Sequence, residues 1–212
     1  MFLFVFIYND PGLLRNHGGP DAETGESMGG TKIIESKNLI LRGTTFEDCD
    51  YFAKWEQDET VTENFIYYRD HSYKEIVTDF VMNNSSESVL QFTIVSKETD
   101  RPVGRMVLTN IDRRTDSLDC HMIYIADRRL RGRGLGEEAM RVILQYAFIN
   151  LHMERITFYH LKQDMPSAQM CLKLGCKDEG VRRHAGKQKG KYLDLYVMSL
   201  LRAEYYEKIH EK

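Results

Sequence analysis

The glycine- and arginine-rich stretch at residues 131–136 has the residue types and spacing best suited to chemistry. It follows an apolar run at residues 122–126 and precedes a helical pattern that begins at Glu137. Glycines let the backbone come close to an anion, and the N–H groups at a helix start attract negative charge. Four arginines crowd the turn, namely Arg128, Arg129, Arg131 and Arg133. Because guanidinium groups bind phosphate well, the stretch predicts a site for a ligand with several phosphates.

The spacing of the glycines narrows the kind of phosphate site. A P-loop requires Gly-Lys followed by Ser or Thr, which this stretch does not contain. A Rossmann fingerprint that begins at Gly132 requires glycine where the chain has Glu137, and it belongs near the start of a βαβ unit. The spacing [QR]-x-x-G-x-[GA] does fit, through Arg131, Gly134 and Gly136. A plain glycine turn between a strand and a helix is the alternative.

Hydrophobic periodicity predicts the elements that must position this loop. The predicted strands are residues 36–42, 89–96, 103–110, 117–126, 155–160, 177–185 and 191–200. The predicted helices are residues 45–58, 72–83, 136–150 and 167–174. Thr45 and Asp48 form a capping-box-like start for the first helix, and Gly175 ends the last one. Residues 97–102 are predicted to turn between two strands of a hairpin, and the polar tail from 201 to 212 is predicted to be a frayed helix.

This order of elements predicts an α/β fold with mixed strand directions, because hairpins and crossovers both occur. At 212 residues the chain is long enough for one domain with its own core. We expect the domain to span residues 36–202, with a flexible extension at 1–35 and a tail at 203–212. The extension begins with a short apolar run that lacks the basic region and cleavage site of a signal peptide, and Met28 is a candidate for the true first residue.

Bulk composition excludes several classes of protein. The chain is 42% apolar and 29% charged, with a net charge of −3, so bulk electrostatics provide no argument for binding nucleic acid. No apolar run approaches the roughly 20 residues of a membrane helix. The cysteines have no zinc-type spacing, which predicts reduced thiols in a cytoplasmic protein and no metal site. They are Cys49, Cys120, Cys171 and Cys176.

Five segments carry a family resemblance: residues 39–42 (Leu-Ile-Leu-Arg), Trp55, residues 131–139 (Arg-Gly-Arg-Gly-Leu-Gly-Glu-Glu-Ala), residues 173–176 (Lys-Leu-Gly-Cys) and residues 190–194 (Gly-Lys-Tyr-Leu-Asp). In this order they resemble the GNAT N-acetyltransferases. They look most like the branch with the Rim-type ribosomal-protein N-terminal acetyltransferases and the spermidine acetyltransferases. The chain departs from the pattern at Asp164, where the family usually has Asn, and at Cys176, where it has Phe. Cys171 stands where many members have a catalytic Tyr.

The resemblance implies the GNAT fold, a mixed and mostly antiparallel sheet flanked by helices, in which the fourth and fifth strands splay apart. It implies acetyl-CoA as the donor, without a metal. The thioester oxygen is then expected to meet backbone N–H groups near residues 124–126. The positions that the resemblance assigns to acetyl-CoA are Tyr124, Ile125, Ala126, Arg131, Gly132, Arg133, Gly134, Leu135, Gly136 and Glu137.

The implied reaction is direct attack of a primary amine on the thioester, which requires a base for the amine and an acid for the leaving thiolate. We favour His121 as the base, because related enzymes often carry Glu there and histidine ordinarily titrates near neutrality. Asp119 and His160 are the alternatives. Ser167 is favoured as the acid, because the Rim-type branch often has a serine early in that helix. Its rivals are Cys171, Tyr192 and Tyr196.

The acceptor is expected to be an amine, and a cationic one, because residues 47–87 hold eleven acidic side chains and three basic ones. In the family this segment forms one wall of the amine site, and a negative rim there attracts a polyamine, an aminoglycoside or a peptide N-terminus. An ordinary acidic helix surface is the other interpretation. A homodimer is a further expectation, and a non-catalytic acetyl-CoA sensor is the alternative function.

Overall fold

The computed structural model describes residues 33–66 and 72–210. The predicted flexible extension and the candidate start at Met28 lie outside the described residues, apart from residues 33–35. Those three residues form strand β1 (Ile33–Glu35), which pairs with the next strand. The sheet therefore begins before residue 36, where we expected the domain to begin, and the domain limits stay a prediction.

The described strands form one eight-stranded sheet in the order β1-β2-β3-β4-β5-β6-β8-β7. All neighbouring pairs are antiparallel except β5 and β6, which run parallel. The α/β fold with a mixed, mostly antiparallel sheet is confirmed. The remaining strands are β2 (Leu39–Gly43), β3 (Leu90–Ser96), β4 (Arg101–Asp112), β5 (Ser117–Ile125), β6 (Arg155–His160), β7 (Lys177–Gln188) and β8 (Lys191–Leu201).

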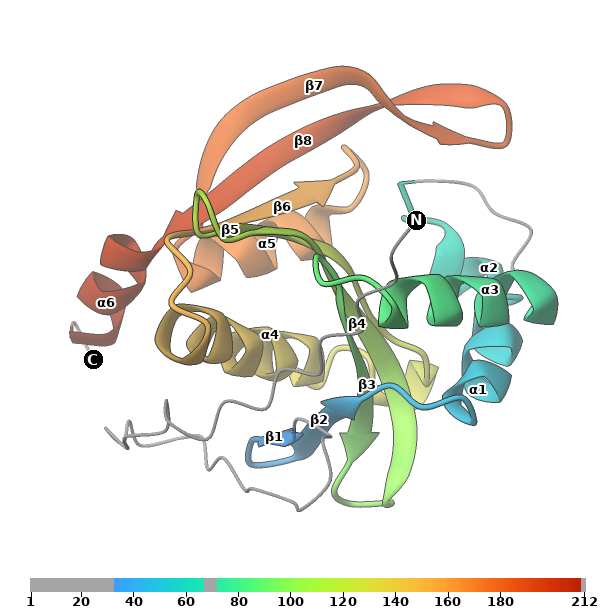
Figure 1. Ribbon diagram of the computed structural model, residues 1–212. Helices are drawn as coiled ribbons and strands as arrows, with labels where there is room; N and C mark the ends of the chain where they lie inside the picture. The colour runs from blue at the N-terminus through green and yellow to red at the C-terminus, as the bar shows by residue number, and fades with distance from the viewer. Residues whose placement is uncertain (1–32, 67–71, 211–212) are drawn as a thin grey trace, which may run out of the picture.

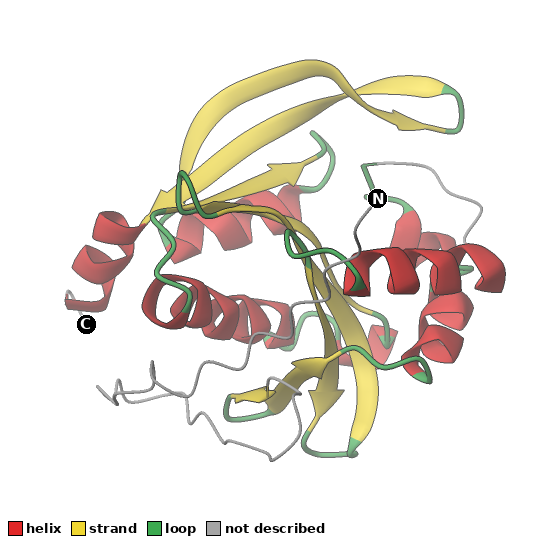
Figure 2. Cartoon of the chain, in the orientation of Figure 1, coloured by secondary structure: helices red, strands yellow, loops and turns green. Residues whose placement is uncertain are grey.

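Helices cover both faces of the sheet, and the β7–β8 hairpin arches away from it (Figures 1 and 2). Figure 1 shows α4 and α5 on one side of the strands and α1, α2 and α3 on the other. The main hydrophobic core lies between the sheet and α4, with a smaller cluster between α1 and α3. The helices are α1 (Asp48–Trp55), α2 (Glu59–Thr62), α3 (Tyr73–Asn84), the short 3₁₀ turn η1 (Arg128–Leu130), α4 (Leu135–Gln145), its π-helical continuation η2 (Tyr146–Asn150), α5 (Met165–Leu174) and α6 (Arg202–His210).

Local capping signals explain where two of these helices begin and end. The hydroxyl of Ser72 accepts a hydrogen bond from the N–H of Glu75 and starts α3, as the sequence predicts. Asp164 caps α5 through the N–H of Ser167. Gly175 ends α5 with a φ of 98°, a left-handed conformation that glycine adopts without strain.

The first predicted helix is wrong in extent. Residues 45–58 form α1 only from Asp48 to Trp55, and a separate short helix, α2, follows. The Asp58 carboxylate accepts from the N–H of Thr60 and so begins α2. One of the two hydrogen bonds of the predicted capping box is present: the Asp48 carboxylate accepts from the N–H of Thr45 at 2.8 Å.

The predicted frayed tail is a helix that contacts the core. Helix α6 spans Arg202–His210, and the ring of Tyr205 stacks on Phe148 with centroids 4.9 Å apart. Burial raises the pKa of Tyr205 to about 12. The C-terminal helix therefore closes one end of the main core instead of extending into solvent.

Candidate active site

Strands β5 and β6 separate after four paired residues. Ser117 to Cys120 of β5 pair with Arg155 to Phe158 of β6, and no pair follows. The register between β4 and β5 shifts at the same point: Leu108 lies opposite Cys120, and Val107 lies opposite Met122. Strand β5 thus has one more residue than β4 there, His121, which is a β-bulge. The splayed pair expected from the resemblance is present, and a bulge marks its start.

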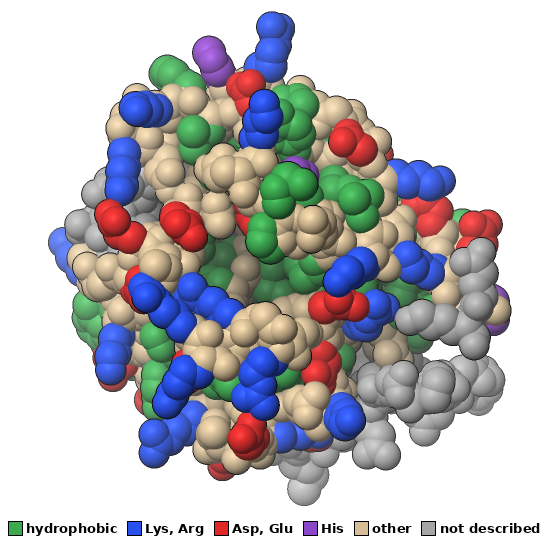
Figure 3. Space-filling model, turned by 180° about the vertical axis from the view of Figure 1, so that it is seen from behind, with side chains coloured by type: hydrophobic (Ala, Val, Ile, Leu, Met, Phe, Trp, Pro, Cys, Tyr) green, Lys and Arg blue, Asp and Glu red, His purple; other side chains and the backbone are tan. Residues whose placement is uncertain are grey.

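A cleft of about 570 Å³ opens where the two strands part. Its walls come from α2 and the loop after it, from β5 and β6, from the glycine loop with the start of α4, and from α5. The face of the molecule in Figure 3 is hollowed near its centre, with hydrophobic side chains in the hollow and Lys and Arg side chains around it. The predicted positions that line the cleft are His121, Tyr124, Ile125, Arg131, Gly132, Gly134, Leu135, Gly136, Glu137 and Ser167, while Ala126 and Arg133 do not line it.

The glycine loop leaves its backbone open on the side of the cleft. Gly132 and Gly134 have φ values of 73° and 81°, and Gly134 is the N-cap of α4 without a side-chain cap. The first N–H groups of a helix have no partner in its own ladder, and here the ladder begins with Glu138 N–H on Gly134 O. No atom lies within 4 Å of a Cβ built on Gly132, Gly134 or Gly136. The backbone beside the cleft is therefore open to a close-lying anion.

The arginines of the loop are used differently from the prediction. The guanidinium of Arg131 donates to the backbone oxygens of Ile125, Ala126 and Thr60. It therefore joins the loop to the end of β5 and to α2. The other three lie against carboxylates: Arg128 with Asp58, Arg129 with Asp127, and Arg133 at 3.8 Å from Glu98. On the side of the cleft, the loop therefore offers a ligand mainly backbone groups and few free guanidinium groups. Which of its residues bind phosphate stays a prediction.

Two of the three predicted oxyanion donors, the N–H groups of Tyr124 and Ala126, point toward β4 within the sheet. The N–H of Ala126 donates to Val103 O at 2.8 Å, so it belongs to the β4–β5 ladder. Alternate residues of an antiparallel strand point their N–H groups to the same side, so Tyr124 N–H also faces β4. The N–H groups of Ile123 and Ile125 then face the side on which β6 has separated. Ile125 therefore remains a candidate for contact with the thioester oxygen, and Ile123 is added in place of Tyr124 and Ala126.

Two histidines from different strands line the cleft. His121 lies in the bulge of β5, and His160 is the last residue of β6. The Nδ1 of His160 lies 2.9 Å from Leu161 O, and because a carbonyl can only accept, that nitrogen carries the proton. The His160 ring also stacks on Tyr196, with centroids 5.4 Å apart. His160 therefore has a fixed ring whose Nε2 is the nitrogen left for chemistry.

The other catalytic candidates separate into those in the cleft and those outside it. Ser167 lines the cleft from the first turn of α5. Asp119 does not line it, because its carboxylate accepts from Asn110 and from the Tyr159 hydroxyl. Tyr192 is 63% exposed on the hairpin, away from the lining. Asp119 and Tyr192 thus do not lie where the reaction would take place.

Cys171 lines the cleft from α5 and belongs to a group of three buried thiols, with Cys120, which also lines the cleft, and Cys176. Its side chain lies within hydrogen-bonding distance of Cys176, and this contact, with burial, raises the pKa of Cys176. The hydrogen bond from Cys176 lowers the pKa of Cys171. Burial raises the pKa of Cys120, the third member. All three are reduced, and their surroundings are those of core residues.

A buried ion pair behind the cleft was missed by sequence reasoning. The guanidinium of Arg105 and the carboxylate of Glu56 lie 3.0 Å apart, and the Tyr124 hydroxyl donates to the same carboxylate at 2.9 Å. The Phe52 ring lies against Arg105, 4.5 Å from its guanidinium carbon. Burial and the negative charge of Glu56 raise the pKa of Tyr124 well above its ordinary value. Tyr124 is therefore held neutral as a wall of the cleft.

Four of the eleven acidic side chains of the segment at residues 47–87 are paired with basic side chains in the fold. Asp48 pairs with Arg42, Glu56 with Arg105, Asp58 with Arg128 and Glu59 with Lys189. Among its described carboxylates, that of Glu63 is in the cleft lining. The segment as a whole is therefore not a uniform negative rim, although one of its acidic residues, Glu63, lines the cleft.

Residues 33–66 and 72–210 contain neither a membrane-spanning helix nor a cluster of metal ligands. No helix in these ranges is long and apolar enough to cross a membrane. No group of three or more His, Cys, Asp or Glu side chains there is arranged to hold a metal ion.

Comparison with known proteins places the chain among acetyltransferases. A family model described as "Acetyltransferase (GNAT) domain" matches residues 38–177. The uncharacterized N-acetyltransferase p20 of Bacillus licheniformis is 29% identical over 82% of this chain and 98% of its own length. The probable N-acetyltransferase YjcK of Bacillus subtilis is 27% identical over 78% of this chain and 87% of its own length. In structure, the chain resembles a spermidine N-acetyltransferase from Vibrio cholerae solved with CoA and spermine, with a TM-score of 0.72, 17% identity, and coverage of 79% and 98%.

Proposed function

Because this chain belongs to the GNAT family of acetyltransferases, we propose that it transfers the acetyl group of acetyl-CoA to a primary amine by direct attack. One observation carries the proposal: the strand splay, the bulge at His121 and the open glycine loop all border the same cleft. Each feature has a structural explanation by itself. Together they supply a diphosphate site, backbone N–H groups and a titratable side chain around one space.

The donor is proposed to bind along the loop and the start of α4. The backbone of residues 132–136 would hold the diphosphate at the helix N-terminus, where the helix dipole favours negative charge. Glu137 lies in this first turn, but its carboxylate pairs with Arg141 and lies 3.9 Å from Lys173, which limits its repulsion of a phosphate. The thioester oxygen would then lie near the N–H groups of Ile123 and Ile125.

The chemistry forms a C–N bond and breaks the C–S bond of the thioester. The attacking amine must be neutral, so a base accepts a proton from it, and the departing thiolate takes up a proton from an acid. We propose His121 as the base, because the bulge places it at the point where the strands part. Ser167, on the α5 wall, is proposed as the acid. His160 is the alternative base, favoured by its fixed ring.

The acceptor class is proposed as a cationic amine. Relatives in sequence are named N-acetyltransferases without a substrate, and the structural neighbour that was solved with spermine shares 17% identity, which speaks for the fold alone. The placement in the Rim-type branch is likewise a proposal from the sequence pattern. The argument for a particular acceptor must therefore come from the residues that line the cleft of this chain.

The test is release of CoA thiol from acetyl-CoA with a panel of polyamines, aminoglycosides and peptides. We expect turnover with at least one amine, and loss of turnover in His121→Ala or His160→Ala, with acetyl-CoA binding retained. Tight binding of acetyl-CoA without turnover of any amine would overturn the proposal and would favour the non-catalytic acetyl-CoA sensor.

A further inference from the structure

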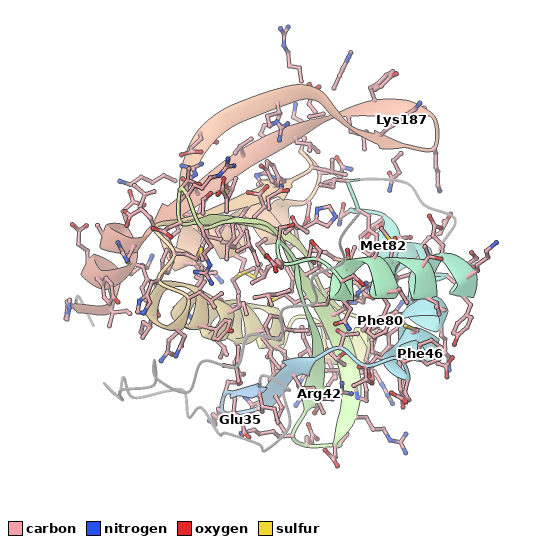
Figure 4. All side chains as sticks on the ribbon, in the orientation of Figure 1. Glu35, Arg42, Phe46, Phe80, Met82 and Lys187 are labelled. Atoms are coloured by element: carbon pink, nitrogen blue, oxygen red, sulfur yellow. The ribbon has the colours of Figure 1, made fainter. Side chains whose placement is uncertain are left out.

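The loop after α2 is held in place by the C-terminal hairpin. The side-chain amide of Gln188 lies 3.2 to 3.4 Å from the backbone oxygens of Thr62, Glu63 and Phe65. The N–H of Lys187 donates to Ile66 O at 3.1 Å. Residues more than 120 positions apart in the chain therefore meet here. The end of the hairpin, where Lys187 is labelled in Figure 4, extends toward the side of the molecule that carries α2 and α3.

Close packing fixes this contact. A Cβ on Gly186 would lie 2.8 Å from Ile66 O, so glycine is required where the hairpin meets the loop. Ile66 is buried in a small cluster with Leu161 and Leu195. The loop at residues 63–66 is therefore a fixed wall, held by side-chain hydrogen bonds on one side and by apolar packing on the other.

Residues 63–66 of this loop line the cleft. Phe65 lies against Tyr124, with ring centroids 5.6 Å apart, and both rings line the cleft. Glu63 lines it as well, and it makes no ion pair with another described residue. An aromatic wall beside a carboxylate suits an alkyl chain that ends in a cation.

We propose that Glu63 binds a second positively charged group of the acceptor, so that the acceptor is a diamine or polyamine. The inference rests on the proposed acetyl transfer. The attacking amine is neutral when it reacts, so it cannot be the group that a carboxylate holds. The second ammonium lies at Glu63, the alkyl chain lies along Phe65 and Tyr124, and the neutral amine lies at the strand splay. Gln188 is a positioning residue, because it holds the loop without touching the acceptor.

The first experiment compares Glu63→Gln with the wild type on α,ω-diamines of increasing length and on aminoalcohols of matched length. We expect KM for diamines to rise about fivefold, the upper range for a solvent-accessible ion pair, with KM for aminoalcohols and for acetyl-CoA unchanged. Added salt should reduce the difference. Glu87→Gln, an exposed acidic position outside the cleft lining, is the matched control and should change nothing.

The second experiment tests the hairpin contact. Gln188→Met keeps the length of the side chain and removes its donor, so KM should rise for diamines and aminoalcohols alike, while KM for acetyl-CoA stays the same. Gln188→Lys retains a donor for the carbonyls and should restore the wild-type KM values. An acetyl-CoA KM that rises with the amine KM in Gln188→Met would indicate general unfolding of the site and would overturn the positioning role.

Failure of this inference is distinguishable from failure of the proposed function. If the wild type acetylates amines but Glu63→Gln leaves the diamine-to-aminoalcohol ratio of KM unchanged, the Glu63 site is wrong and the acetyl transfer stands. If no amine is acetylated, calorimetric binding of a diamine to the wild type and to Glu63→Gln in the presence of CoA still decides the matter. Equal binding by the two proteins would overturn the inference.

Discussion

Glu56 and Arg105 form an ion pair inside the protein, with side chains that are 0% and 1% exposed and charged atoms 3.0 Å apart. The pair joins the end of α1 to β4, and through the Tyr124 hydroxyl it reaches the wall of the cleft. Arg105 Nε is a buried donor without a partner among the described residues, so the guanidinium depends strongly on Glu56. The wall of the cleft at Tyr124 is thus built on a charge pair that solvent does not reach.

Breaking the ion pair between Glu56 and Arg105 should lower the stability of the fold. Arg105→Met leaves the Glu56 carboxylate buried without its counter-charge, and we expect a loss of about 3 to 5 kcal/mol in the free energy of unfolding, measured by urea denaturation. The double variant Glu56→Leu with Arg105→Met should recover much of that loss, because no buried charge is left. Arg114→Met, at an exposed pair with Asp112, is the control and should unfold like the wild type. Equal stability of Arg105→Met and wild type would contradict this account.

Gly134 should matter for the donor, beyond its effect on stability. Gly134→Ala places a Cβ at a left-handed residue beside the cleft, and we expect KM for acetyl-CoA to rise roughly tenfold, the equivalent of one lost charged hydrogen bond. Gly190→Ala is the matched control, because Gly190 has a similar φ of 78° but lies outside the cleft lining. Both variants should lose about 1 kcal/mol of stability. A similar rise in KM for both would mean that backbone strain, and not the loop, is responsible.

Asp48 should make folding stability depend on acid pH. Burial raises the pKa of its carboxyl, but hydrogen bonds from Arg42, Thr45 and Thr93 outweigh burial, so the pKa lies below the ordinary value of 3.8. A carboxylate with a lowered pKa stabilises the fold above about pH 4, and this contribution is lost as the pH falls through the folded-state pKa.

The measurement is the free energy of unfolding of wild type and Asp48→Asn between neutral pH and pH 3. We expect the variant to be less stable by about 1 to 3 kcal/mol at neutral pH, and the difference to shrink below pH 4. A difference that stays constant down to pH 3 would show that the charge of Asp48 is not what stabilises the start of α1.

Variants of the two cleft histidines, His121 and His160, should show which of them is the catalytic base. If His121 is the base, His121→Gln should lower kcat by about 10²-fold and remove the acid limb of the kcat profile, while His160→Gln keeps that limb. If His160 is the base, His160→Gln should lower kcat and remove the acid limb, while His121→Gln keeps it. Retention of the acid limb in both single variants would exclude each as the base, and the amine would then lose its proton to water or another group.

Sequence patterns were sufficient where the determining signal is local. Strand β6 was predicted at residues 155–160 and lies there, and α3 begins at Tyr73, one residue after its predicted start. The glycine loop was recognised from spacing alone, because a left-handed turn before a helix requires glycine at particular positions. The fold class follows from the same local periodicities taken in order.

Long-range contacts were not predictable in the same way. The break between α1 and α2 has a local part, the Asp58 cap, but the buried partner of Glu56, Arg105, lies 49 residues later in the chain. The sequence suggested that the acidic segment is a uniform negative rim, because nothing in residues 47–87 indicates which carboxylates pair with Arg42, Arg128 or Lys189.

The sequence by itself determined the family, most of the order of elements and the position of the glycine loop, because each depends on the short-range spacing of glycines and apolar residues. Only the tertiary structure decided which charges remain available in the cleft and which histidines face it. It brought Gln188 onto the loop of Glu63, although the two are 125 residues apart. The physical reason is that burial and pairing of a charge depend on distances across the sheet, which spacing along the chain does not encode.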